Sequence, residues 1–89
     1  MGIKPYKIEF LKDVTETDLP ALPKTIRLRV EKAIKEHLTV NPDKIGKSLS
    51  YKFKGSRRMR VGDYRVIYEI DNIEHMVVVS AIRHRKDSY

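Results

Sequence analysis

The 89-residue sequence contains no cysteine, and this absence excludes several kinds of chemistry together. Without a thiol there is no disulfide, no thiolate nucleophile and no zinc site built on cysteine. The three histidines, His37, His75 and His84, are scattered and do not have metal-ligand spacing. We therefore expect no metal centre and no other cofactor.

Long apolar runs are also missing. No stretch approaches the roughly 20 residues that a membrane-spanning helix needs, and no signal-peptide core follows Met1. Met1-Gly2 does not open a myristoylation site, because Tyr6 stands where Ser or Thr is expected. These absences predict a cytoplasmic protein with no membrane partner.

Positive charge is what the sequence has in excess. Nineteen Lys and Arg face twelve Asp and Glu, which gives a net charge of +7. The length suits one hydrophobic core, and no repeat or linker divides it, so residues 1–89 are predicted to form a single domain. The surplus favours a polyanionic partner, since counterion release supplies affinity. Charge alone does not distinguish such a protein from a small basic domain that merely stays soluble.

The apolar pattern predicts an α+β fold of order β-α-α-β-β-β, with two helices packed on one face of a small, mainly antiparallel sheet. Residues 6–10 alternate between apolar and polar, as in a strand with one buried face. Asp13 and Glu16 have the spacing of a capping box and predict the start of a short helix, which Pro20 and Pro23 interrupt. Pro23 suits the first turn of a second helix, which Asn41-Pro42 ends. The buried stripe of that helix is predicted to be Ile26, Val30, Ala33, Ile34 and Leu38.

The second half of the chain is predicted to supply the sheet. Residues 43–56 are polar and are expected to form a connection with one turn of helix. Strands are expected at 57–61, 64–70 and 75–82, with Gly62-Asp63 as a two-residue hairpin turn. The valine-rich segment 76–79 predicts a central strand that is buried on both faces.

The hairpin gathers arginines on one face. Its two-residue turn implies the register Val61 opposite Tyr64, Arg60 opposite Arg65, Met59 opposite Val66, and Arg58 opposite Ile67. Alternation then turns Arg58, Arg60 and Arg65 away from the core. Two arginines directly opposite each other cost about 0.2–1 kcal/mol, which a bound anion would remove. The alternative is a solvated charged face on which Glu69 partly neutralises Arg58.

The basic tail extends this cluster. Arg83-His84-Arg85-Lys86 leaves the last strand. If that strand pairs beside the hairpin, Arg83 and Arg85 extend a positive groove and His84 lies at its rim. A guanidinium group binds phosphate well, and the terminal Tyr89 can stack on a base. A solvated tail with no site is the alternative.

Three stretches in order resemble the RelE/ParE toxin superfamily. They are the run from Arg58 to Ile70 with its specific R-V-G-D-Y-R-V-I-Y core, the valine-rich strand, and the tail from His84 to Tyr89. The resemblance implies the RelE fold and a type II toxin–antitoxin pair. The partner it implies is a small cognate antitoxin, acidic in its C-terminal part. RelE-like members cleave messenger RNA in the ribosomal A site, whereas ParE-like members inhibit DNA gyrase.

The RelE branch implies a metal-free reaction in which the ribose 2′-OH attacks the adjacent phosphate and leaves a 2′,3′-cyclic phosphate. Carried over by position, Arg65 would clamp the scissile phosphate, Arg85 would neutralise it or assist the leaving group, and Tyr89 would orient a nucleotide. Arg58 and Arg60 stand where some relatives carry lysines, and arginine, with a pKa of about 12.5–13.8, is a poor general base. Proton transfer is therefore expected of His84, with Glu69 as a weaker candidate. The expected contacts to messenger and ribosomal RNA are Arg57, Arg58, Arg60, Arg83 and Lys86.

These features favour a ribosome-dependent endoribonuclease. Two alternatives stay open, a ParE-like gyrase inhibitor without nuclease chemistry and an RNA-binding family member that has lost catalysis. A neighbouring reading frame for a short protein with an acidic, amphipathic C-terminal half would establish the toxin class.

Overall fold

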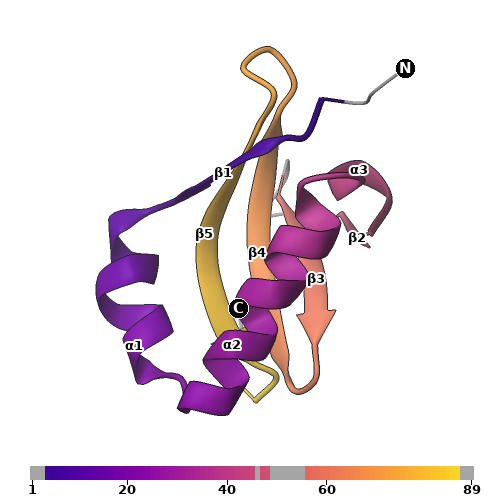
Figure 1. The fold of residues 1–89 in the computed structure, drawn as a ribbon. Coiled ribbons are helices and arrows are strands. Elements are labelled where there is room, and N and C mark those ends of the chain that lie inside the picture. The colour runs from indigo at the N-terminus through magenta and orange to yellow at the C-terminus, as the bar shows by residue number, and fades with distance from the viewer. Residues whose placement is uncertain (1–3, 46, 49–55, 87–89) are drawn as a thin grey trace.

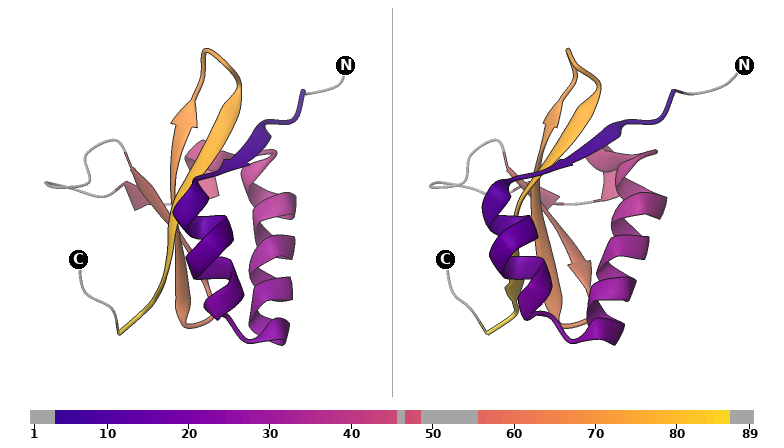
Figure 2. Two further views of the ribbon diagram at one scale, coloured as in Figure 1. Left: turned by 90° about the vertical axis from the view of Figure 1, so that its left-hand side faces the viewer. Right: turned by 60° about the vertical axis from the view of Figure 1, so that its left-hand side comes forward.

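The chain folds into a mixed sheet with helices on one face (Figures 1 and 2). The computed structural model describes residues 4–45, 47–48 and 56–86. The strand order is β1-β5-β4-β3-β2. The β1–β5 pair is parallel and the other pairs are antiparallel. The strands are β1 (Lys7–Phe10), β2 (Lys47–Ser48), β3 (Arg57–Val61), β4 (Tyr64–Asp71) and β5 (Met76–His84).

The first helical segment follows β1 directly. A π-helical stretch (Val14–Asp18) continues into α1 (Leu19–Ala21). Asp13 already has helical φ and ψ and forms no side-chain cap, so the predicted capping box is wrong. Pro20 does not interrupt the segment either, since the backbone stays helical through Ala21. The chain leaves the helix at Leu22, whose ψ of 141° is extended.

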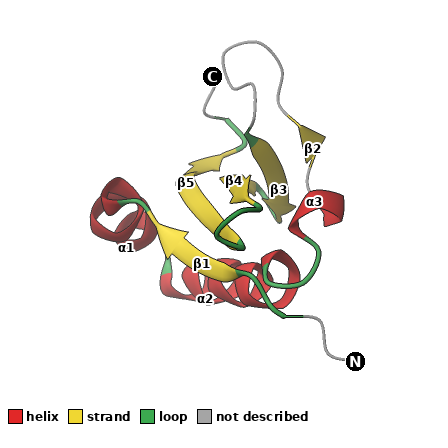
Figure 3. Ribbon diagram, turned by 90° about the horizontal axis from the view of Figure 1, so that it is seen from above, coloured by secondary structure: helices red, strands yellow, loops and turns green. Residues whose placement is uncertain are grey.

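The second helical segment covers the core face of the sheet. It comprises α2 (Lys24–Ala33) and a π-helical stretch (Ile34–Leu38), and the short α3 (Pro42–Ile45) follows. Pro23 occupies the N-cap position directly before α2, not the first turn as predicted, and forms no side-chain cap. Seen end-on, α2 lies against one side of the sheet and α1 lies near the β1–β5 side (Figure 3). The predicted apolar stripe is confirmed, since Val30, Ile34 and Leu38 are buried and Ile26 and Ala33 pack against the same core.

The hairpin of β3 and β4 has the predicted register at all four pairs. Gly62 occupies the turn with a φ of +59°, a conformation that glycine adopts without strain. The predicted sheet lacked β2, which pairs Lys47 with Arg58 and Ser48 with Arg57. One turn of helix in the connection is confirmed as α3, and the rest of that connection, residues 46 and 49–55, lies outside the described residues.

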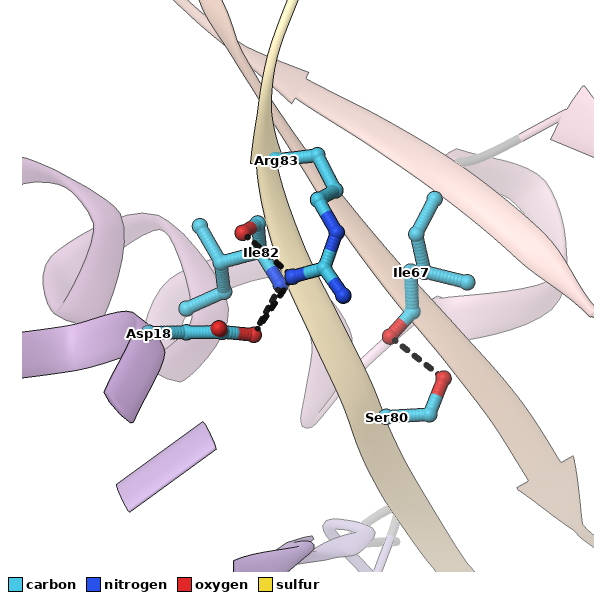
Figure 4. A network of polar contacts seen from close by, with 5 residues as sticks. All are labelled: Asp18, Ile67, Ser80, Ile82 and Arg83. Atoms are coloured by element: carbon cyan, nitrogen blue, oxygen red, sulfur yellow. Dashed lines mark hydrogen bonds and ion pairs between the residues drawn. The ribbon is translucent and has the colours of Figure 1, made fainter. Parts of the chain in front are cut away.

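Strand β5 differs from its prediction in two ways. Its place between β1 and β4 is central, as predicted, but it runs on to His84, two residues beyond the predicted end. Val77 and Val79 are fully buried, whereas Met76 and Val78 are partly exposed, so the expectation of burial on both faces is wrong. Ser80 has no partner in the register with β4, and its hydroxyl donates to the Ile67 carbonyl at 3.3 Å (Figure 4). This bulge shifts the second half of the β4–β5 ladder.

The core fills the space between the sheet and the helices. Tyr68 is fully buried at its centre, and its phenolic O–H donates to the Pro42 carbonyl at 2.6 Å, which ties β4 to α3. In the described residues, no helix is both long enough and apolar enough to span a membrane.

Candidate nucleic-acid interface

A row of three arginines crosses the sheet on the face opposite the helices. Arg60 of β3 pairs with Arg65 of β4, and Arg65 pairs with Arg83 of β5. The neighbouring row, Met59, Val66 and Ile82, is buried in the core, so alternation turns the arginines to the other face. The hairpin prediction thus holds for both Arg60 and Arg65. Strand pairing places the Arg65 backbone between two other cationic residues.

A hollow of about 480 Å³ lies at the hairpin end of this row. Four of its lining residues are cationic and come from three separate parts of the chain, whereas Asp63 is the one lining carboxylate in the described residues. A concave surface with this balance of charge is suited to a phosphate group. The lining comprises Arg60, Gly62, Asp63, Tyr64, Arg65, Arg85 and Lys86.

Asp63 joins the tail to the hairpin turn. Its carbonyl accepts the Arg85 N–H at 2.7 Å, which places Arg85 beside the hollow. Its carboxylate lies 3.8 Å from Nε of Arg85, and both side chains are more than 60% exposed, so this ion pair is weak. The backbone bond is therefore the main restraint on Arg85. The guanidinium group keeps most of its surface available to a ligand.

Arg83 shares the row but is directed to the edge of the sheet (Figure 4). Its Nη1 donates to Oδ2 of Asp18 at 2.9 Å and to the Ile82 carbonyl at 3.2 Å. The same Oδ2 accepts the Ile82 N–H at 3.0 Å. Strand β1 pairs with β5 only as far as Val79, so Asp18 and Arg83 satisfy the outward peptide groups of Ile82 in place of a strand. The expectation that Arg83 extends the groove is corrected, because its guanidinium is held by Asp18 and does not line the hollow.

Arg57 lies on the core face, two residues from the buried Met59. Its Nη2 donates to the Asp43 carbonyl at 2.6 Å and so fastens β3 to α3. Arg57 is therefore not brought together with the arginine row. Arg58 does share the outer face, opposite Ile67, but within the described residues it forms no ion pair with Glu69, which is exposed further along β4.

His84 lies on the other face of the sheet from Arg65. It pairs with Tyr64, and the two rings meet edge to face with centroids 5.0 Å apart. Its Nδ1 accepts the Lys86 N–H at 3.2 Å. The side chain contributes to a separate hollow of about 430 Å³ beside the first helical segment, with Thr17, Asp18 and Leu22 among its walls. The expectation that His84 forms the rim of the arginine groove is therefore wrong. Lys86 does line the groove, and the hydrogen bond from its N–H to His84 helps to hold it there.

The sequence predicts no site role for three further residues around this site. Asp63 is predicted only as part of the hairpin turn, Asp18 has no local pattern that links it to β5, and Arg29 lies in the exposed part of α2. Tyr89 lies outside the described residues. Within the described ranges, no three His, Cys, Asp or Glu side chains gather as they would around a metal ion.

Comparisons with known sequences find two kinds of toxin, ParE in the family model and RelE or RelG among the individual relatives. Residues 8–89 match the family model described as the ParE toxin of the type II toxin–antitoxin system, parDE. Toxin RelE of Mycobacterium tuberculosis is 38% identical over 72 residues, which is 81% of this chain and 74% of the relative. Toxin RelG of the same organism is 33% identical over 85 residues, covering 96% of this chain and 97% of the relative.

Solved structures extend the likeness to three dimensions. The crystal structure of the toxin–antitoxin complex RelBE2 from Mycobacterium tuberculosis contains a chain with a TM-score of 0.86 and 31% identity, and the match covers 97% of this chain and 98% of that one. The isolated RelE toxin of E. coli has a TM-score of 0.75 at 18% identity, covering 93% and 87% of the two chains, which shows a shared fold.

Proposed function

Because the chain belongs to the RelE/ParE superfamily of type II toxin–antitoxin toxins, we propose that it is an endoribonuclease that cuts messenger RNA in the ribosomal A site. The ribose 2′-OH attacks the adjacent phosphate, the bond to the 5′ oxygen breaks, and the products carry a 2′,3′-cyclic phosphate and a free 5′-OH. No metal takes part. The protein acts in the cytoplasm.

The observation that carries this proposal is the hollow beside the paired arginines. Negative charge builds up on the phosphorane oxygens in the transition state, and donors fixed in advance around those oxygens stabilise it. Arg60 and Arg65 come from adjacent strands of a rigid sheet, so little reorganisation is needed. Their mutual repulsion before RNA binds is relieved when the phosphate enters.

The proposed roles follow from position. Arg65, partly buried on the central strand, clamps the scissile phosphate, and Arg60 binds the same group from β3. Arg85 at the rim neutralises the leaving oxygen, while Arg58 extends the contact along the outer face. Tyr89 stacks on a nucleotide, as the resemblance implies.

Proton transfer requires a titratable group that lines the hollow. In the described residues, Asp63 and Lys86 meet this condition, together with the phenol of Tyr64. Asp63 is the carboxyl group among them and is suited to accept the proton of the 2′-OH, with Lys86 beside the leaving oxygen. His84 instead positions Lys86 through the bond to its N–H.

The proposed partner is a small antitoxin that covers the basic groove in the resting cell with acidic residues of its C-terminal part. RelBE2 of Mycobacterium tuberculosis, a structural match, is a toxin–antitoxin complex. A positive groove and an acidic segment are complementary in charge, which speeds association and selects the partner. Co-expression with the product of the neighbouring gene tests this, and separate elution of the two proteins at low salt contradicts it.

The enzymatic proposal is tested with purified ribosomes programmed with a defined message. The wild type is expected to cut within the A-site codon and leave 2′,3′-cyclic phosphate ends. Arg60→Ala/Arg65→Ala is expected to abolish the cut, whereas Lys24→Ala/Lys35→Ala removes the same charge from exposed helix positions and is expected to cleave normally. Equal loss in both double variants would show that net charge alone is responsible.

A second candidate, inhibition of DNA gyrase, is favoured by the match to the ParE family model. It predicts that the wild type blocks DNA supercoiling and leaves the message intact. A third, RNA binding without catalysis, predicts that the protein binds programmed ribosomes and has neither activity. The two assays together separate all three functions.

A further inference from the structure

A second, smaller hollow adjoins the arginine groove at the hairpin turn. It has a volume of about 160 Å³ and lies between α2 and the β3–β4 turn. Gly62, Asp63 and Tyr64 line both hollows, so the two lie on either side of the same turn. Its remaining walls are Ile26, Arg29 and Val61.

The walls of this second hollow combine three apolar or aromatic side chains with one cation, Arg29, and one carboxylate, Asp63. Ile26 and Val61 supply aliphatic surface and Tyr64 supplies an aromatic ring. A cavity of about 150 Å³ is enough to hold a benzene ring, so a volume of about 160 Å³ accommodates a six-membered heterocycle. Sequence-tolerant binding of single-stranded RNA combines such stacking surface with a nearby cation.

Arg29 supplies that cation, and its guanidinium group can bind a ligand. A β-carbon built on Gly62 would lie 3.6 Å from its Nη2 and 3.8 Å from its Nη1, so the guanidinium lies directly over the turn. Arg29 is exposed, and among the residues that the structure describes it forms no hydrogen bond or ion pair. Glycine at position 62 is favoured by its φ of +59°, since a β-carbon there would meet the guanidinium group only at ordinary van der Waals distance.

We propose that this hollow is a nucleotide subsite in which the base of a residue flanking the scissile phosphate packs against Ile26, Val61 and Tyr64 while Arg29 binds that nucleotide's phosphate. The inference rests on the proposed function for the identity of the polymer, RNA. Asp63 lies between the two cationic regions and disfavours a phosphate at that point. The backbone phosphates are thus directed to Arg29 on one side and to Arg60 and Arg65 on the other.

The test uses 2′-O-methyl hexanucleotides, which lack the attacking hydroxyl and therefore report binding alone. One base at a time is replaced by an abasic unit, and affinity is measured by fluorescence anisotropy at fixed, low salt. At one position, loss of the base is expected to weaken wild-type binding about tenfold. Arg29→Ala is expected to weaken binding of the intact strand about tenfold as well, and to make the abasic change at that position nearly neutral.

Lys32→Ala is the matched control, because Lys32 is an exposed cation of the same helix and does not line the hollow. It is expected to retain the full abasic effect. Arg29→Ala is expected to melt with the wild type, since its side chain has no partner in the described residues to lose. An Arg29→Ala variant that keeps the abasic effect overturns the subsite, as does a wild type with no sensitive position or no measurable oligonucleotide binding.

The same preparations are assayed for cleavage on programmed ribosomes. If the protein cleaves but the abasic effect does not depend on Arg29, the subsite proposal is wrong and the nuclease proposal stands. If the abasic effect depends on Arg29 but the protein does not cleave, the subsite proposal stands and the nuclease proposal is wrong. The two proposals therefore fail separately.

Discussion

Two neighbouring rows of residues cross the same three strands and face opposite sides of the sheet. Met59, Val66 and Ile82 are at most 5% exposed and pack under the helices. One position along each strand, Arg60, Arg65 and Arg83 form the other row. The first row removes apolar surface from water, which stabilises the fold. The second places like charges side by side, which opposes it. Stability and proposed function thus alternate along the strands, and changes one residue apart are expected to have opposite consequences.

The largest expected effect is on chemistry at the outer row. Arg65→Ala is expected to lower the cleavage rate on programmed ribosomes about 100- to 1,000-fold, because a fixed donor to the phosphorane is lost. Ribosome affinity depends on the whole basic surface and is expected to change less than about tenfold. Single-turnover cleavage and ribosome pelleting measure the two quantities. Equal losses would mean that Arg65 only docks the protein.

At Val66, the core position next to Arg65, a substitution is expected to lower stability and to leave cleavage unchanged. Val66 is fully buried, so Val66→Ala is expected to lower the free energy of unfolding by roughly 2 kcal/mol. Urea denaturation measures this loss. Below the transition, the variant is expected to cleave at the wild-type rate per folded molecule. A catalytic loss as large as that of Arg65→Ala would contradict the separation of the two faces.

Asp18 contacts one residue of each row at the edge of β5, the backbone N–H of Ile82 and the side chain of Arg83. Asp18→Ala is expected to cost roughly 1–2 kcal/mol, mainly through the buried acceptor that Ile82 loses, since Arg83 is partly exposed and its ion pair is screened. Asp18→Asn retains an acceptor and is expected to lose less. Urea denaturation of both variants checks the order. If the asparagine variant were the less stable one, the ion pair would be the dominant contact.

Removal of one charge from the outer row is expected to stabilise the fold. Arg60→Thr removes the like-charge pair with Arg65 and is expected to raise the free energy of unfolding by about 0.2–1 kcal/mol while cleavage falls. Arg27→Thr on α2 removes the same charge elsewhere and serves as the control. A less stable Arg60→Thr would show that the arginine contributes more through packing than it costs in repulsion.

The smallest effect is expected at His84. Because it lies beside Tyr64 and not in the hollow, His84→Gln is expected to change the cleavage rate less than about threefold, since glutamine can also accept the Lys86 N–H. Asp63→Asn is expected to lower the rate much more. A 100-fold loss in the glutamine variant is the size expected for a proton-transfer group and would return that role to His84.

Much of the fold could be predicted because its signals are local. The Gly62-Asp63 turn determines the register of β3 and β4, and alternation then assigns each side chain to a face. Strand β2 could not be predicted, since it has two residues and depends on pairing with β3. The contact of Asp18 with Ile82 and Arg83 joins distant segments and has no local pattern.

The site could be predicted wherever the strand, and with it the alternation of side chains between the two faces of the sheet, was predicted to its true end. Arg60 and Arg65 follow from the hairpin alone. The predicted last strand ends at Ile82, and the prediction places Arg83, His84 and Arg85 together along the groove beyond that end. Strand β5 in fact continues to His84, and alternation over those extra residues places His84 on the face of Tyr64. Arg29 required the tertiary approach of α2 to the turn.

The parallel pairing of β1 with β5 affects when the protein can fold during and after its synthesis. Lys7 and Met76 are partners, so the first strand cannot pair until the last one has been made. Contacts between such distant segments require a large loss of chain entropy before they form, and they slow folding. Strand β5 also leads directly into Arg85 and Lys86. A chain that stops before Met76 therefore lacks the β1–β5 and β5–β4 pairings and two cationic walls of the hollow, and we expect no partly synthesised or partly folded form to be toxic to the cell that makes it.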